Sequence, residues 1–352
     1  MIRILSCIVR FDKKANMYRG RGRSKTSLAS SRDGSEFHFC RPEKMKVDSD
    51  LLKNYKSSLK CIGGYSVDDE QNFYNDKSFL CFLNTDYLPG EDSKEKVVEL
   101  DLNTAKDDEK PYTGTLLKTS ENFFSWISSS MDDLTEIFSL NGIVYLLNHK
   151  EPENYALEPQ ISRWGHKFQQ FLTYGENVKE GVVCNRDYRC VMNGKLGSHN
   201  LLFSASMDCF NQDICDFESL DPSSSILLKC SFDNQKKNSL ERFKMYDWCA
   251  SLAAANIPHV LVGFRTADGI VELLKLYSED DLRILDINVG FTFVENALSF
   301  IEKTTKAKPG TVFSFTKTSS SSLKAEETNM ENFPPKWFTE ELEESGILDH
   351  ES

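Results

Sequence analysis

The sequence has 352 residues, of which 39% are hydrophobic and 27% are charged, as is typical of a soluble globular protein with a large core. No stretch approaches the roughly 18 apolar residues that a membrane-spanning helix needs, so we expect no membrane partner. The net charge of −12 argues against nucleic-acid binding over the whole surface, although a local basic segment can still bind phosphates.

Such a segment lies at the N-terminus, where "YRGRGRSK" (18–25) alternates Arg with Gly. We predict a basic flexible tail over residues 1–30 that is able to track phosphates, the alternative being a solvated, disordered terminus without that role. Residues 31–342 are predicted to form a single domain with a polar loop or linker at 316–331, and residues 343–352 an acidic tail.

The ten cysteines are spread along the chain and form no CxxC motif. Cys184 and Cys190, like Cys209 and Cys215, are six residues apart, which fits neither a zinc knuckle nor a zinc ribbon. We therefore expect no zinc and reduced cysteines, as in an intracellular protein of the nucleus, the cytoplasm or both.

The clearest periodic segments lie between residues 160 and 300. The sequence predicts a helix over 161–175, strands over 201–210 and 224–232, and a helix over 239–256 that ends before Pro258. Two strands follow at 259–264 and 270–277, and "SEDD" (278–281) has the pattern of a capping box that opens another helix. Alternating helices and strands of this kind indicate a mixed α/β fold.

The strand over 201–210 carries an unusual polar face. Alternate residues of a strand share a face, so Ser206 and Asp208 lie together, as do Leu227 and Lys229 on the next strand. Many metal-dependent nucleases have a strand with an aspartate, followed by a strand with a carboxylate two residues before a lysine. Here the second carboxylate position is Leu227, so Asp208 and Lys229 are equally compatible with a structural ion pair.

Four longer segments carry a resemblance to a known family. The segments "RWGHKFQQFL" (163–172), "KLGSHNLLFSASMDC" (195–209), "ILLKCS" (226–231) and "IPHVLVGFRTADGIV" (257–271) resemble the successive motifs of the decapping exoribonuclease family. The resemblance implies a single mixed α/β domain with two β-sheets flanked by helices and a PD-(D/E)xK nuclease-like core. It also implies the removal of faulty or NAD-type caps from RNA 5′ ends with Mg²⁺ or Mn²⁺, and some members bind a 5′→3′ exoribonuclease instead.

Several positions depart from the family's pattern. The helix motif usually ends in Lys-Phe-Glu, whose glutamate binds metal, and here Lys167 and Phe168 are followed by Gln169. The first strand usually carries Glu-x-Asp, and here that pair is Ser206 and Asp208.

The second strand usually reads Glu-Leu-Lys, and here it reads Leu227, Leu228 and Lys229. The family usually has a glutamine in the following helix, and here that position is Ser251. The family also has an N-terminal arginine that contacts substrate, and in a poorer alignment that position is Thr113. Three metal-binding carboxylates of the family are thus replaced, at Gln169, Ser206 and Leu227.

The resemblance implies roles for the remaining residues. Lys229 would be the catalytic lysine, and Lys167 and Ser251 would contact substrate. A metal ion would retain three ligands, which are the Asp208 carboxylate, the Gln169 amide oxygen and the Leu228 carbonyl.

The leading hypothesis is a family member that binds RNA 5′ ends or a partner protein with a degraded metal site. The alternatives are an active decapping enzyme that uses loop acids, and a scaffold for an exoribonuclease without RNA affinity. The candidate loop acids are Asp213, Asp216 and Glu218. We expect strands 201–210 and 224–232 to be neighbours in one sheet, with Ser206, Asp208, Leu227 and Lys229 facing a common cleft bordered by the helix of Gln169.

Overall fold

The structure is a computed structural model. It describes residues 2–3, 36–38, 47–68, 72–103, 135–140, 143–147, 160–174, 186–216, 220–232, 244–282, 287–319 and 322–328. Thr113, Glu218, the Arg/Gly segment 18–25 and the acidic segment 343–352 lie outside these residues. No helix in the described ranges combines the length and apolarity needed to cross a membrane.

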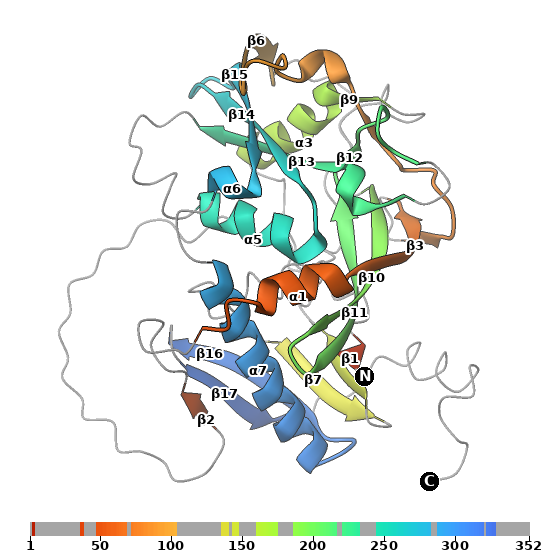
Figure 1. The fold of residues 1–352 in the computed structure, drawn as a ribbon, viewed down its shortest axis with the longest axis vertical. Coiled ribbons are helices and arrows are strands. Elements are labelled where there is room, and N and C mark those ends of the chain that lie inside the picture. The colour runs from red at the N-terminus through yellow and green to blue at the C-terminus, as the bar shows by residue number, and fades with distance from the viewer. Residues whose placement is uncertain are drawn as a thin grey trace, which may run out of the picture.

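Two mixed sheets form the framework, as expected for the fold (Figure 1). The ten-stranded sheet contains, in spatial order, β2 (Glu36–His38), β17 (Ser322–Glu327), β16 (Val312–Ser319), β7 (Thr135–Leu140), β8 (Ile143–Leu147), β1 (Ile2–Arg3), β11 (His199–Met207), β10 (Asp187–Leu196), β3 (Lys60–Val67) and β4 (Phe73–Tyr74). The seven-stranded sheet contains β6 (Glu95–Asp101), β15 (Ile270–Ser278), β14 (His259–Arg265), β13 (Ser225–Phe232), β12 (Cys209–Phe210), β5 (Phe82–Leu83) and β9 (Thr173–Tyr174).

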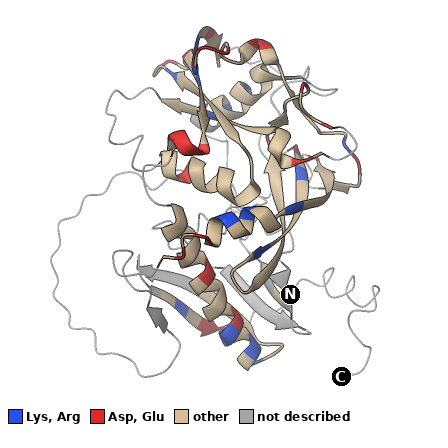
Figure 2. Cartoon of the chain, viewed as in Figure 1, with Lys and Arg blue, Asp and Glu red and all other residues tan. Residues whose placement is uncertain are grey.

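Helices cover both sheets and fill the space between them. They are α1 (Leu51–Ser58), α3 (Gln160–Leu172), α5 (Tyr246–Ala255), α6 (Glu279–Leu282) and α7 (Ile287–Ala307), with short 3₁₀ turns at Thr85–Tyr87 and Pro222–Ser224. Helix α1 lies between the two halves of the molecule (Figure 1), where the Tyr55 hydroxyl donates to the Ala254 carbonyl over 2.6 Å. Lys56 of α1 also pairs with Glu279 of α6, whose acidic residues stand out in Figure 2.

Most elements predicted between residues 160 and 282 are present, although α3 ends at Leu172 and the described part of the helix predicted over 239–256 is α5 alone. Helix α5 ends where Asn256 adopts a left-handed conformation with φ 56°. Strand β14 pairs parallel to β13 and antiparallel to β15. At the start of α6, the Ser278 backbone N–H donates to the Asp281 carboxylate over 2.9 Å while the Asp281 N–H donates to the Ser278 hydroxyl over 3.3 Å, which confirms the capping box.

Helix α3 packs against β14 where Gly263 faces the Phe168 ring. A Cβ added to Gly263 would lie 2.3 Å from the Phe168 ring, so no larger residue fits there without a shift. The Arg265 guanidinium, 4.5 Å from the centre of the Trp164 ring, adds a second contact between β14 and α3. These contacts set the position of Gln169.

The segment 201–210 is not one strand, and this corrects the expectation that it pairs with 224–232 in a single sheet. Residues up to Met207 belong to β11 and pair with β10 in the ten-stranded sheet. Only Cys209 and Phe210, as β12, pair with β13 in the seven-stranded sheet. The chain changes sheets at Asp208, and the alternation of side chains continues through the bend, so the pattern does not show it.

Two other expectations about loops differ from the structure. Residues 316–331 were expected to form a polar loop, but β16 and β17 form an antiparallel hairpin there, and Phe313, Phe315 and Leu323 are buried. The polar residues of the hairpin alternate with these apolar ones, so composition alone conceals the strands. Within the predicted tail 1–30, Ile2–Arg3 forms β1 between β8 and β11.

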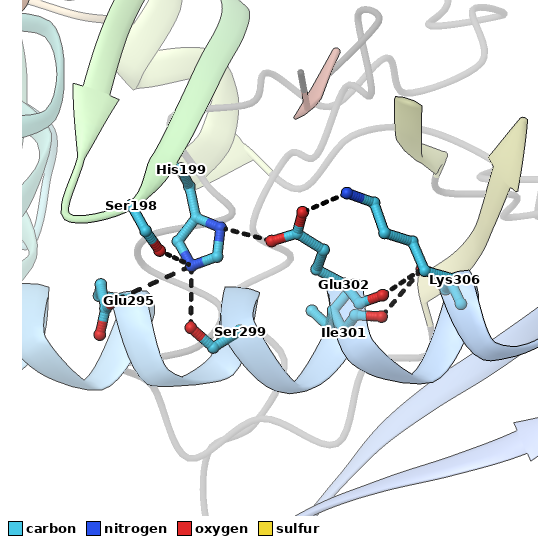
Figure 3. A network of polar contacts seen from close by, with 8 residues as sticks. Ser198, His199, Glu295, Ser299, Ile301, Glu302 and Lys306 are labelled. Atoms are coloured by element: carbon cyan, nitrogen blue, oxygen red, sulfur yellow. Dashed lines mark hydrogen bonds and ion pairs between the residues drawn. The ribbon is translucent and has the colours of Figure 1, made fainter. Parts of the chain in front are cut away.

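A buried histidine attaches the turn between β10 and β11 to α7 (Figure 3). His199 Nε2 lies 2.9 Å from the Ser299 hydroxyl, and Nδ1 lies 3.0 Å from Glu302 Oε2. Lys306 holds the other oxygen of Glu302 at 2.5 Å. Gly197, with φ 57°, makes the turn and approaches Glu295 too closely for a Cβ. The network thereby fixes the long β10–β11 hairpin on its helix.

Candidate functional site

Asp208 occupies the bend between the two sheets, and three nitrogen donors contact its carboxylate. Oδ1 accepts from Nε2 of Gln169 over 3.0 Å. Oδ2 accepts from the backbone N–H of Leu228 over 2.7 Å and lies 3.5 Å from Nζ of Lys229. The Asp208 side chain is only 12% exposed, so these contacts replace most of its hydration.

The structure brings the expected residues of α3, β12 and β13 together. The 3.0 Å contact between Gln169 and Asp208 confirms that α3 borders the cluster. Because a carboxylate can only accept, the Gln169 amide must present its nitrogen to Asp208, with its oxygen turned away. The Lys229 side chain is 35% exposed, and its ammonium lies 3.5 Å from Asp208.

Leu227 does not face this cluster, which corrects the predicted common cleft. Its side chain is 4% exposed and belongs to the main hydrophobic core between the sheets. Leu227 and Lys229 do share a face of β13, but the flexible lysine side chain extends from the core to the surface. The backbone N–H of Leu228 takes part, while its side chain packs under α3.

A second carboxylate, which sequence reasoning missed, lies beside the first. Asp187 Oδ1 accepts from the Ser206 hydroxyl over 2.7 Å, and Oδ2 accepts from Nε of Arg189 over 2.9 Å. Burial raises the pKa of Asp187 despite these two partners, and the charge of Asp208 raises it further. The available signal was the sequence Asp-Tyr-Arg at the start of β10, whose alternate residues share one face.

The thiol of Cys81 reports on the same pair of acids. Burial, together with the charges of Asp187 and Asp208, raises the pKa of Cys81 to about 11. The thiol is therefore protonated at neutral pH and is no nucleophile.

The remaining candidates lie outside the hydrogen bonds of Asp208. Lys167 is two residues from Gln169, about 200° around the helix, and its ammonium contacts Gln170 at 3.2 Å and the Phe171 ring. The Ser251 hydroxyl donates to the Asp247 carbonyl within α5. Their proposed contacts with substrate stay predictions. Asp213 and Asp216 are exposed residues of the loop after β12.

The residues present do not fit an oxygen-ligated divalent ion. No three His, Cys, Asp or Glu side chains of the described ranges are placed to hold a metal. Both oxygens of Asp208 accept from nitrogen donors, and Asp187 is paired with Arg189. Since Mg²⁺ demands several oxygens in near-ideal geometry, an ion would have to displace most of these donors.

The charges of the cluster also balance. Lys229 offsets Asp208 and Arg189 offsets Asp187, so the cluster has no net charge when all four groups are ionised. A divalent ion is held by carboxylates in excess of the cations around it. The arrangement can instead present an ammonium, held by a carboxylate, to an anionic ligand.

Comparison with known proteins agrees with the motifs. Curated relatives include the decapping and exoribonuclease protein of Mus musculus, 33% identical over 127 residues, which are 34% of this chain and 31% of the mouse protein. The Homo sapiens protein of the same name is 28% identical over 151 residues, 39% of this chain and 38% of that protein. The matches thus span about a third of the length of these relatives.

Solved structures share the fold over most of the chain. S. pombe Rai1 matches with a TM-score of 0.62 at 19% identity, covering 84% of this chain and 99% of Rai1. Candida albicans Rai1, solved in complex with pU5-Mn²⁺, matches with a TM-score of 0.60 at 13% identity, covering 86% and 97%. A family model described as "RAI1 like PD-(D/E)XK nuclease" matches residues 134–339, more than half of the chain. The chain therefore belongs to the RAI1-like PD-(D/E)XK nuclease family.

Proposed function

We propose that this chain binds the 5′ ends of RNA at the Asp208–Lys229 cluster and does so without a divalent ion in the position that the family uses. The observation that carries the proposal is the set of donors around Asp208, namely the amide of Gln169, the N–H of Leu228 and the ammonium of Lys229. A carboxylate held in this way orients a lysine for an anion rather than coordinating a metal.

Each residue of the cluster has a part in this proposal. Lys229 donates to the terminal phosphate, since its side chain is partly exposed and its ammonium has three N–H groups. Asp208 and Leu228 fix the direction from which the lysine approaches. Gln169 holds Asp208 in place by donating to it. Because these residues supply no activated water, we propose binding rather than hydrolysis.

The wider setting follows from the named relatives. Proteins called decapping and exoribonuclease protein resemble the chain, and we propose a role in RNA 5′-end quality control, including NAD-capped RNA. A 5′→3′ exoribonuclease is the protein partner that the family resemblance suggests. We place the protein inside the cell, in the nucleus, the cytoplasm or both, because none of its described cysteines forms a disulfide.

The most discriminating variant is Asp208→Asn, because its effect on RNA binding and cleavage depends on whether Asp208 is a metal ligand or the ion-pair partner of Lys229. Fluorescence anisotropy with 5′-phosphorylated pentauridylate, measured in EDTA and in Mn²⁺, should give equal affinities for the unaltered chain. Asp208→Asn should keep its affinity within about threefold, since removal of a negative charge beside the phosphate offsets the lost orientation of the lysine. The double variant Asp208→Asn/Lys229→Met should lose about tenfold, as expected for one charge-assisted contact.

Asp213→Asn, an exposed acid of the neighbouring loop, is the matched control and should leave both affinities unchanged. Cleavage of the RNA in Mn²⁺ that Asp208→Asn abolishes would overturn the proposal and show an active metal enzyme. Cleavage abolished instead by Asp213→Asn or Asp216→Asn would show that loop acids have replaced the lost ligands.

A further inference from the structure

An exposed aromatic ring lies at the edge of the ten-stranded sheet, on the edge strand β4. Phe73 is 56% exposed, and its ring centre lies 5.7 Å from that of Tyr65 on β3, with the planes tilted by 55°. Its exposed neighbours are the polar residues Asn72, Asn75 and Asp76 and the ring of Tyr74, which is 41% exposed and donates a hydrogen bond to Asp68. Two rings among polar residues suit a flat, polar-edged ligand better than a broad apolar protein interface.

Strand register places this ring on the same face as the Asp208 cluster. Arg189 is paired with Ser206 on one side and with Tyr65 on the other. Asp187 is paired with Val67, which is paired in turn with Phe73. Directly paired residues point to one face of a sheet, so the two rows run side by side from the cluster to the sheet edge.

The connection between ring and cluster is also direct. The Tyr65 phenol accepts a hydrogen bond from the Arg189 guanidinium, and Arg189 in turn holds Asp187. Nη1 of Arg189 is buried and has no hydrogen-bond partner among the described residues. A buried donor without a partner is costly, and an oxygen of a bound ligand would satisfy it.

We propose that Phe73, supported by Tyr65, is a stacking platform for a base of single-stranded RNA whose 5′ phosphate lies at Lys229. The proposal rests on the function proposed above. From β11 to β4 is three strand spacings, about 14 Å, a distance that two to three nucleotides span. Stacking on an aromatic face tolerates any base, so the platform lengthens the binding site without adding sequence preference.

The test compares two probes and three variants by fluorescence anisotropy or competition. The probes are 5′-phosphorylated pentauridylate, which reaches Phe73, and uridine 5′-monophosphate, which does not. Phe73→Leu keeps an apolar side chain without a π face and should weaken pentauridylate binding roughly tenfold while leaving the mononucleotide unchanged. Phe73→Trp should bind pentauridylate at least as tightly and show quenching of its added indole emission.

Val97→Ala is the control, since Val97 is 84% exposed on β6, an edge strand of the other sheet. It should change neither affinity. Equal pentauridylate affinities for the unaltered chain and Phe73→Leu would overturn the platform, and the mononucleotide result would still report on the phosphate site. Failure of the unaltered chain to bind either probe would overturn the proposed function and the platform together.

Discussion

The residues around Asp208 show how a site changes when its acids are replaced. Gln169 and Ser206 stand where the family resemblance places metal-binding glutamates, and each now donates to a carboxylate that remains. The neutral side chains thus satisfy acids that would otherwise repel each other across a buried space. In this sense the substitutions stabilise the fold in place of an ion.

Restoring one glutamate of the family's pattern should remove this stabilisation. Gln169→Glu places a third carboxylate against Asp208, about 3 Å from Oδ1, near Asp187, whose pKa burial already raises. When the pKa of a carboxyl group is higher in the folded than in the unfolded state, its contribution to the free energy of unfolding is fully present at low pH. That contribution is lost as the pH rises through the folded pKa. We expect the variant to lose about 1–3 kcal/mol at pH 8 and much less at pH 5.

Urea unfolding at the two pH values measures this, with and without Mn²⁺. Gln170→Glu is the control, because its neighbour Lys167 offers a salt bridge and no carboxylate is opposed. Leu227→Glu is unsuited to a restored site, since it would bury a charge in the core. Equal stability of Gln169→Glu at pH 5 and pH 8 would contradict the proposed repulsion.

Among the elements, α3 decides the geometry of the site, because it carries Gln169 and touches both β13 and β14. Its distance from the sheet depends on Gly263, which leaves room for the Phe168 ring. The sequence pattern predicts the helix and its apolar face, while the spacing to the sheet comes from this contact.

Gly263→Ala should therefore displace α3 and with it the Gln169 amide. The added methyl group would lie 2.3 Å from Phe168, and overpacking of this kind costs about 1–3 kcal/mol. Thermal unfolding gives the loss of stability, and hydrogen exchange at the Leu228 N–H reports a loosened Asp208. Gly165→Ala, on the same helix with no atom within 4 Å of the new Cβ, should instead gain about 0.5–1 kcal/mol.

At the scale of the whole molecule, the net charge of −12 opposes general RNA binding and leaves recognition to a few local cations. One or two phosphate contacts predict a slope of log affinity against log salt of about −0.7 to −1.4 for single-stranded RNA. Affinity for pentauridylate should then fall only about three- to sevenfold between 50 and 200 mM salt.

A much steeper slope would mean that the Arg/Gly segment 18–25 supplies most of the binding. Neutralising Arg19, Arg21 and Arg23 to Gln measures that share directly. Deleting residues 1–26 is a poorer experiment, because it also removes β1 from the middle of the ten-stranded sheet.

The sequence by itself determined the parts that depend on local pattern. The periodicity of α3, the strands β13, β14 and β15 and the capping box of α6 follow from spacing within a dozen residues. The motifs also identified the family and predicted that four residues lie close together, namely Gln169, Asp208, Leu228 and Lys229. Each of these features depends on residues that are neighbours in the chain, so the sequence pattern is enough to predict it.

The tertiary structure alone decided the features that depend on long-range pairing. It places the change of sheet at Asp208, buries Leu227, forms the β16–β17 hairpin and brings Asp187 and Arg189 beside the site. Alternation along a strand gives two faces but does not say which neighbour covers each face. The partners of Asp208 and Asp187 come from α3 and from three different strands, and only the packed fold brings those elements together.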